Sequence, residues 1–308
     1  MLGHITDPAA DGGLVRRDLP EPKPGPHDAV IEVAAYAVNR GELSLLQARP
    51  DGWTPGQDVA GVVVEAAADG SGPGAGTRVV GVADQGGWSE RVAVPSHRVA
   101  ALPAAVTFQR AASLPVAGLT ALRALRTGGP LLGRKVLITG SSGGVGSFAV
   151  QLARAAGAHV TAGVSGPHRA DHVRALGADE VITAIGPDSG PFDLILDGVG
   201  GPVLTDAVHR LAVGGTVTAY GVASGQRSKL AFYDFRESTP GSKLQAFFLY
   251  RTGEQTFGQD LATLAGLVAD GRLDPQLGVV RDWSETLEAV AALRDRQVTG
   301  KAVLTRIA

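Results

Sequence analysis

The sequence predicts an α/β protein in which a β domain is joined to a domain built on a doubly wound, mostly parallel sheet. Short β-type runs separated by Gly and Pro fill the chain before residue 108, as in a compact and largely antiparallel β domain. From about residue 108, strand-like and helix-like runs alternate, which is typical of a parallel sheet. Within this second pattern an apolar run at 136–139 ends in glycines spaced three apart.

The β domain is predicted from four runs rich in Val and Ala, which lie at 29–34, 59–65, 78–82 and 89–94. A helical segment follows through 117–125. The strands of the parallel sheet are then expected at 136–139, 159–164, 180–182, 192–197, 215–220 and 244–250. A helix near 257–270, a strand at 277–280, a helix near 283–294 and a strand at 301–307 complete the chain, the last strand rejoining the β domain.

The glycines after the 136–139 strand are Gly140, Gly143 and Gly146, and an amphipathic helix follows them. Gly140 permits a tight turn, Gly143 lets the backbone approach a phosphate, and Gly146 lets the helix lie close to the sheet. The free N–H groups at the start of that helix then face an anion. The pattern predicts a diphosphate cradle, and a purely structural glycine turn is the alternative.

The end of the 159–164 strand indicates which dinucleotide would bind. A carboxylate at this place accepts hydrogen bonds from a ribose 2′-hydroxyl and repels a 2′-phosphate. No acid occurs here before Asp171, whereas Ser165 and Arg169 can both donate hydrogen bonds to a phosphate. The sequence therefore favours NADPH over NADH. The alternative is that Arg169 is a solvated charge on the next helix, and His168 is a weaker candidate.

Composition limits the function further. The 308 residues carry a formal net charge of −2 and no basic cluster, which argues against a nucleic-acid partner. We find no apolar run of about 20 residues and no leader pattern, so we expect no membrane partner and a cytoplasmic location. The chain has no cysteine, which excludes disulfides, thiolate metal ligands and a cysteine nucleophile.

Short motifs spread over nearly the whole chain resemble one family. They lie at 38–43, 55–63, 86–90, 118–121, 143–146, 197–201 and 300–304. Jointly they are similar to the medium-chain dehydrogenase/reductases, and within these to the zinc-independent quinone oxidoreductases. The resemblance implies a GroES-like β domain, residues 1–113 with 251–308, that closes over a Rossmann NADPH-binding domain, residues 114–250.

The zinc-dependent branch of that family holds its metal with a Cys and with a His-Glu pair after a Gly. Here Gln57 and Asp58 follow Gly56, and there is no Cys. Tetrahedral zinc needs about three protein donors. We therefore expect no metal at these positions.

The resemblance also implies the residues that contact the cofactor. Asn39 and Thr120 are expected near the nicotinamide and its ribose, the glycine turn at the diphosphate, and Arg169 with its neighbours around the adenosine phosphate. Tyr220 and Gly221 are expected on the adenine side, and the backbone of 247–249 at the carboxamide. The full set is Asn39, Thr120, Gly140, Gly143, Gly144, Val145, Gly146, Gly163, Ser165, Arg169, Tyr220, Gly221, Phe247, Phe248 and Leu249. The alternatives are a helix cap for Asn39, plain packing for Thr120, and a core or dimer interface for Phe247 and Phe248.

Hydride transfer to a quinone or an α,β-unsaturated carbonyl needs a fixed nicotinamide, a dry slot and stabilisation of the oxygen that becomes negative. A hydroxyl, an amide N–H or water can meet the last need without a metal. We expect Tyr36, Asn39 and Thr120 to be catalytic and Glu42 to lie beside the same cleft, although Tyr36 is equally typical of a core position. Where relatives have a Tyr before Pro55, this chain has Trp53. A tyrosine acid is therefore not expected at that place.

Four aromatic residues are expected either at the rim of the substrate pocket or as packing residues. They are Trp53, Trp88, Tyr233 and Phe235. The apolar strand 244–250 is expected at a sheet edge, where pairing with a second copy would form a homodimer.

Two other functions remain open from the sequence. Residues 140–144 also match the Gly-x-Ser-x-Gly elbow of a serine hydrolase, with Ser142 as nucleophile and Asp197 and His209 downstream. A relative that binds NADPH without turnover is the other alternative. The identity of the acceptor is not predicted.

Overall fold

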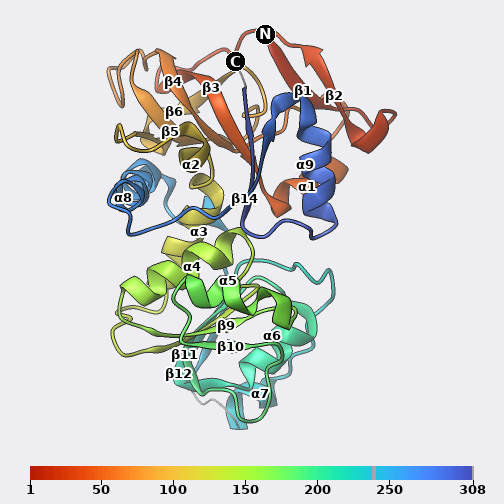
Figure 1. Ribbon diagram of the computed structural model, residues 1–308, viewed down its shortest axis with the longest axis vertical. Coiled ribbons are helices and arrows are strands. Elements are labelled where there is room, and N and C mark those ends of the chain that lie inside the picture. Colours follow the sequence, from red (N-terminus) through yellow and green to blue (C-terminus); the bar gives the residue numbers. More distant parts are fainter. Residues whose placement is uncertain (238–240, 307–308) are drawn as a thin grey trace. The chain divides into compact units, whose positions relative to one another are not determined.

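The computed structural model describes residues 1–237 and 241–306 of the chain (Figure 1). These residues divide into two compact units, residues 1–119 with 253–308 and residues 120–252. The first unit corresponds to the expected β domain and the second to the expected parallel-sheet domain. The first break lies six residues later than the expected limit at 113, inside a helix, and the second lies two residues later than the expected limit at 250.

The first unit is built on an antiparallel sheet. Its strand order is β14-β15-β3-β4-β5-β7, and β6 pairs with β3. The strands are β3 (Asp28–Val38), β4 (Asp58–Glu65), β5 (Arg78–Val82), β6 (Arg91–Pro95), β7 (Val99–Ala101), β14 (Leu277–Asp282) and β15 (Lys301–Thr305). All neighbours are antiparallel except β14 and β15. A separate antiparallel hairpin joins β1 (Leu2–Thr6) and β2 (Leu14–Asp18).

The C-terminal segment completes this sheet, as the sequence predicts. β15 pairs with β3 over residues 302–305 and 35–38. Ile307, the last residue of the expected strand, lies outside the described residues. The helices of this unit are α1 (Arg40–Ala48), α2 (Phe108–Ala112), α8 (Phe257–Ala269) and α9 (Thr286–Arg294). Helix α3 (Pro115–Arg126) contains the break between the two units.

An aromatic stack fills the core of the first unit. Tyr36 lies between Trp88 and Trp283, with ring centroids 5.8 Å and 5.2 Å away. Tyr36 and Trp88 are both fully buried. Trp88 is therefore a packing residue of the core, the second of its two expected places, because the 86–90 loop folds inward against Gly56.

The second unit is built on a parallel sheet with the strand order β10-β9-β8-β11-β12-β13. The strands are β8 (Lys135–Thr139), β9 (His159–Gly163), β10 (Glu180–Ile182), β11 (Phe192–Asp197), β12 (Leu211–Ala219) and β13 (Lys243–Ala246). All of these pairs are parallel. The helices between them are α4 (Gly144–Ala155), α5 (Ala170–Ala175), α6 (Gly201–Val208) and α7 (Phe232–Glu237).

The order of this sheet locates a binding crevice. The chain moves outward from β8 through β9 to β10, and then returns to the other side of β8 with β11. In such a doubly wound sheet, ligands bind at the carboxyl ends of the strands where the order reverses. Here that point lies between β8 and β11.

β13 is an edge strand, as predicted, but it is shorter than the expected 244–250. It ends at Ala246, and a 3-10 turn at Leu249–Arg251 follows. Within the described ranges, no helix has the length and apolar character needed to cross a membrane.

Candidate cofactor and active site

The glycine turn follows β8 at the point where the strand order of the second unit reverses. Gly140 has a φ of +63°, which L side chains rarely adopt. A Cβ on Gly146 would lie 2.4 Å from the carbonyl oxygen of Gly140 and 2.6 Å from the Cα of Ser141. The turn therefore folds back onto the first turn of α4, and only glycine fits at both positions.

The start of α4 is open to a ligand. Gly143 is its N-cap and makes no side-chain capping hydrogen bond. Gly143, Gly144 and Val145 are half-buried, whereas Gly146 is buried. The first N–H groups of a helix have no partner within it, and the helix dipole is positive at this end. A diphosphate fits this backbone arrangement.

Arg169 lies beside the same turn. It ends a short 3-10 helix, Pro167–Arg169, that follows β9. Its Nη1 donates a hydrogen bond to the Ser142 hydroxyl over 3.2 Å, and the residue is half-buried. The guanidinium is therefore bound to the glycine turn and is not a fully exposed surface charge. Asp171, the first acid after β9, is almost fully exposed and pairs with Arg174 over 3.0 Å.

The other expected contacts near the adenosine phosphate differ in exposure. Gly163 is half-buried at the end of β9, and Ser165 and His168 are exposed. His172, on α5, approaches the Ser147 hydroxyl at 3.5 Å. Burial, together with the charge of Arg169, lowers the pKa of His172. The imidazole is thus kept neutral beside the arginine.

Tyr220 and Gly221 follow the carboxyl end of β12, as the glycine turn follows the carboxyl end of β8. The Tyr220 hydroxyl donates to the Thr139 carbonyl over 3.4 Å, and its ring lies against Gly198, where a Cβ would be 2.6 Å away. Burial, followed by the charge of Asp197, raises the pKa of Tyr220. The phenol is therefore protonated at neutral pH.

The 247–249 segment is held to the sheet and to the following turn by its own backbone hydrogen bonds. The Phe247 N–H donates to the Ala219 carbonyl over 2.8 Å, and the carbonyls of Phe248 and Leu249 accept bonds from the turn that follows. The Phe248 side chain is 62% exposed, so it is not a core residue. Thr120 lies on α3 and is 7% exposed.

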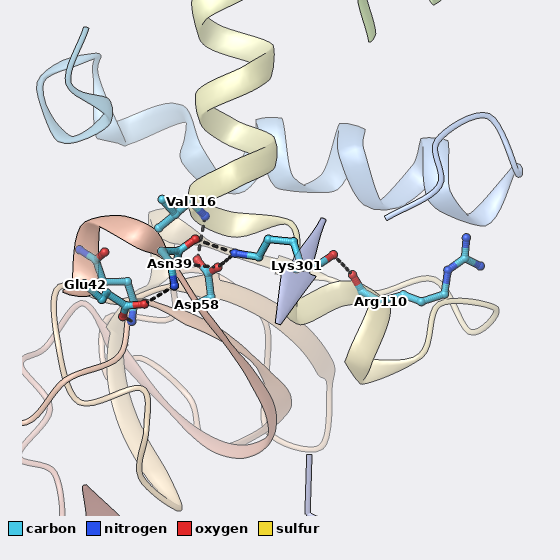
Figure 2. A network of polar contacts seen from close by, with 8 residues as sticks. Asn39, Glu42, Asp58, Arg110, Val116 and Lys301 are labelled. Carbon is cyan, nitrogen blue, oxygen red and sulfur yellow. Dashed lines mark hydrogen bonds and ion pairs between the residues drawn. The ribbon is translucent and has the colours of Figure 1, made fainter. Parts of the chain in front are cut away.

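A buried polar network surrounds Asn39 in the first unit (Figure 2). The Asn39 Nδ2 donates to Asp58 Oδ2 over 2.9 Å, and its Oδ1 accepts from Lys301 Nζ over 2.6 Å. Lys301 Nζ is also 2.9 Å from Asp58 Oδ2. The second oxygen of Asp58 accepts the N–H of Val116 over 2.8 Å. Asn39 is also the N-cap of α1, where it forms a capping box with Glu42, the third residue of the helix.

Glu42 closes the network on the other side. Its carboxyl oxygens accept the N–H of Asn39 over 2.7 Å and the N–H of Gln57 over 3.0 Å. The residue is fully buried. Burial, followed by the charge of Asp58, raises the pKa of Glu42 to about 8. Glu42 therefore fixes the backbone N–H groups of Asn39 and Gln57 and does not line an open cleft.

Comparisons with known proteins agree with this architecture. The family described as alcohol dehydrogenase GroES-like domain matches residues 25–104, and the family described as zinc-binding dehydrogenase matches residues 170–304. The solved structure of the mycobacterial protein Rv1454c, complexed with NADPH, has a TM-score of 0.87 at 27% identity and covers 99% of both chains. The chain belongs to the medium-chain dehydrogenase/reductase superfamily.

Within this superfamily the chain is quinone oxidoreductase-like. A chloroplast envelope quinone oxidoreductase homolog of Arabidopsis thaliana is 37% identical over 186 residues, which are 55% of this chain and 56% of the relative. A trans-enoyl reductase of Aspergillus flavipes is 38% identical over 200 residues, 56% of this chain and 57% of the relative. The chain thus spans about half the length of these curated relatives.

The residues of this chain differ from the zinc ligands of the superfamily's zinc enzymes. Gln57 and Asp58 follow Gly56, and the chain has no cysteine. Asp58 is already bonded to Asn39, Lys301 and Val116. Across residues 1–237 and 241–306, no group of three His, Cys, Asp or Glu side chains has an arrangement that could hold a metal ion.

Tyr36, which was expected to be catalytic, lies in the core. Tyr36 is fully buried, and its hydroxyl is hydrogen-bonded to the Thr286 hydroxyl over 2.6 Å. Burial raises the pKa of Tyr36. The expectation that Tyr36 is catalytic is wrong, because its hydroxyl is enclosed within the aromatic core of the first unit.

The predicted serine-hydrolase triad does not assemble. Ser142 accepts a hydrogen bond from Arg169. Asp197 is buried and accepts bonds from the Thr139 hydroxyl over 2.6 Å and from the Gly200 N–H over 2.8 Å. His209 pairs with Asp234 over 3.7 Å. Each of the three residues thus has a partner outside the proposed triad, and Asp197 serves to join the ends of β8 and β11.

The other three aromatic residues expected at the pocket rim or as packing residues lie in different environments. Trp53 is half-buried, and its Nε1 donates to Gln85 over 2.6 Å. Tyr233 is 59% exposed. Phe235 packs against the hydrophobic core of the second unit.

Sequence analysis missed two residues of the site, Asp58 and Lys301. Both stand in the motifs at 55–63 and 300–304, but each begins a strand whose other residues are mainly apolar. Lys301 is only 3% exposed. The available signal was a lysine directly before the apolar run 302–304, because a lysine that is buried with such a strand is rare unless it is paired.

Proposed function

We propose that this protein is an NADPH-dependent reductase that transfers hydride to a quinone or to an α,β-unsaturated carbonyl. The observation that carries the proposal is the half-buried Arg169, whose guanidinium bonds Ser142 in the glycine turn. The uncapped start of α4 supports a diphosphate site, and the lack of an acid at the end of β9 supports a 2′-phosphate.

The residues of the second unit are proposed to hold and orient the cofactor. The backbone of 143–146 binds the diphosphate, Ser165 and Arg169 bind the 2′-phosphate, and the backbone at 247–249 holds the carboxamide. Gly140 and Gly163 keep the strand ends free of side chains. Tyr220 and Gly221 border the adenine, and Thr120 borders the nicotinamide ribose. When bound, the reduced nicotinamide supplies the hydride.

Asn39 is proposed as the group of the first unit that touches the acceptor. Its amide has one N–H beyond the one given to Asp58. Such an N–H stabilises an oxygen that becomes negative as hydride arrives. For an enone, hydride adds to the β carbon and a proton from water adds to the α carbon. For a quinone, one hydride and one proton give the hydroquinone.

The names of the relatives support both acceptor classes. The Arabidopsis relative is a quinone oxidoreductase homolog, and the Aspergillus relative is a trans-enoyl reductase. The mycobacterial structure was solved with NADPH. These names do not separate the two acceptor classes for this chain.

Steady-state loss of NADPH absorbance, measured with a panel of para-quinones, ortho-quinones, enones and enoyl thioesters, tests the proposal. We expect turnover with at least one acceptor and a higher kcat/KM with NADPH than with NADH. Tight NADPH binding without oxidation by any acceptor would instead indicate a non-catalytic NADPH-binding protein.

We further propose that the protein is a homodimer that pairs through β13. This strand lies at the edge of its sheet. Leu244 within it and Phe248, two residues after its end, expose 38% and 62% of their surface. Unpaired strand edges with apolar side chains favour pairing with a second chain. Light scattering at micromolar concentration is expected to give the mass of two chains, and the mass of one chain would contradict the proposal.

A further inference from the structure

The Asn39 amide lies between two buried groups of opposite charge. Lys301 is 3% exposed and Asp58 is fully buried, and each is hydrogen-bonded to one end of the amide. The two charged groups also contact each other over 2.9 Å. Figure 2 shows that Asn39, Asp58 and Lys301 converge on one point from separate elements.

The chemistry of these partners leaves the amide only one orientation. An ammonium group can only donate hydrogen bonds, and an ionised carboxylate can only accept them. Asp58 receives its bonds from the Val116 N–H, from Asn39 Nδ2 and from Lys301 Nζ, which are all donors. A flipped Asn39 would place its NH2 against the ammonium and its oxygen against the carboxylate. Both contacts would be repulsive.

The amide orientation also sets what Asn39 can offer a ligand. One of its two Nδ2 hydrogens is used by Asp58, so one remains. The Lys301 ammonium on Oδ1 polarises the amide and strengthens its remaining N–H as a donor. The backbone is held as well, because Glu42 accepts the Asn39 N–H.

We infer that Asp58 and Lys301 are positioning residues, which hold the Asn39 amide so that its second Nδ2 hydrogen faces the bound acceptor. The inference rests on the proposed function for the nature of that ligand. Asp58 begins β4 and Lys301 begins β15, 243 residues later. The C-terminal strand thus supplies a functional part of the site in addition to completing the sheet.

The first test follows the amide itself and needs no activity. In ¹⁵N-labelled protein, the Asn39 side-chain resonances are assigned by their loss in N39A. We expect slow exchange with solvent in the wild type and in K301R, which keeps a buried cation. In D58N/K301Q, where both charges become amides of similar size, we expect exchange at least about 10-fold faster.

Leu304→Ala is the matched control, because Leu304 lies on the same strand and packs in the core without touching the network. It is expected to lower the melting temperature while leaving the Asn39 resonances unchanged. If D58N/K301Q does not fold, D58N/K301M, which also removes both charges, gives the same comparison. Unchanged Asn39 exchange in the folded variant would overturn the inference.

The second test is a mutant cycle in NADPH oxidation with 1,4-naphthoquinone, or with the best acceptor of the panel. N39A and D58N/K301Q are each expected to lower kcat/KM by about 10-fold or more, and the triple variant by no more than N39A alone. Losses that multiply would show that Asp58 and Lys301 act independently of Asn39 and would contradict the inference. If no acceptor is reduced while the amide responds as expected, the proposed function fails and the positioning role stands.

Discussion

The glycine turn of the second unit and the Asn39 network of the first unit are built in opposite ways. The turn is made of backbone within seven consecutive residues, Gly140 to Gly146, and its shape depends on absent side chains. The network is made of side chains from β4, β15 and the residue before α1, and its shape depends on buried charges. A site of the first kind tolerates no added atoms. A site of the second kind tolerates no loss of a partner.

The largest expected effect comes from adding atoms to the turn. Gly146→Val places a Cβ within 2.4 Å of the Gly140 oxygen and must open the turn. We expect NADPH affinity to fall by at least about 100-fold, because the N–H groups of α4 no longer converge on one anion. Fluorescence titration with NADPH measures this loss.

Gly266→Ala is the control for a glycine in a helix. Gly266 lies within α8, and an added Cβ there has no neighbour within 4 Å. We expect unchanged NADPH affinity and a gain in stability of up to about 1 kcal/mol, since alanine favours the helix. Equal NADPH binding by both glycine variants would show that the turn does not form the diphosphate site.

The second-largest expected effect is on stability and comes from removing one charge of the Asn39 network. Lys301→Met leaves Asp58 buried without its counter-charge, and such a loss costs about 3–5 kcal/mol of unfolding free energy. Urea denaturation followed by circular dichroism measures this cost. D58N/K301M, which removes both charges, is expected to be more stable than K301M alone. If K301M were more stable than D58N/K301M, the unpaired charge of Asp58 would not be the cause of the destabilisation.

The third effect is a change of cofactor preference at Arg169. A hydrogen bond to a charged group contributes about 1.5–3 kcal/mol, so Arg169→Gln is expected to weaken NADPH binding by about 10- to 100-fold and to leave NADH binding nearly unchanged. Arg174→Gln is the matched control, because Arg174 is exposed and pairs only with Asp171 among the described residues. Calorimetric titration of both variants with both cofactors gives the four affinities. An equal loss for NADPH and NADH in R169Q would contradict a role at the 2′-phosphate.

The last effect, which is the smallest when taken per pH unit, is a pH dependence of stability that arises from Glu42. Its pKa is raised to about 8 in the folded protein, from an ordinary value of 4.5. Between these values the folded state binds more protons than the unfolded state, so this group's contribution is full below about pH 4.5 and is lost as the pH rises through about 8. The slope is at most about 1.4 kcal/mol per pH unit. Melting temperatures of wild type and E42Q between pH 5 and 9 measure it, and identical slopes would contradict the assignment.

The same contrast explains what the sequence could predict. The glycine turn, its βαβ context and Arg169 lie within about 35 consecutive residues, so local pattern was enough to bring them together. The edge position of β13 and the return of the C-terminal strand to the β domain also followed from the order of the elements.

The Asn39 network could not be predicted in this way, because Asn39 and Lys301 are 262 residues apart and meet only through the pairing of β15 with β3. Tyr36 was misjudged for a related reason. The end of β3 is buried on both faces, from Ala35 to Val38, so it lacks the alternation that separates inward from outward residues. For Trp88 the sequence left a pocket rim and a packing position open, because nothing local shows that its loop folds inward.

The central claim is that the turn after β8 and Arg169 together hold a phosphorylated dinucleotide. Calorimetric titration of the wild-type protein with NADPH and with NADH tests it most directly. The account predicts one NADPH per chain, bound at least about 10-fold more tightly than NADH. No binding of either nucleotide, or equal affinity for both, would contradict it.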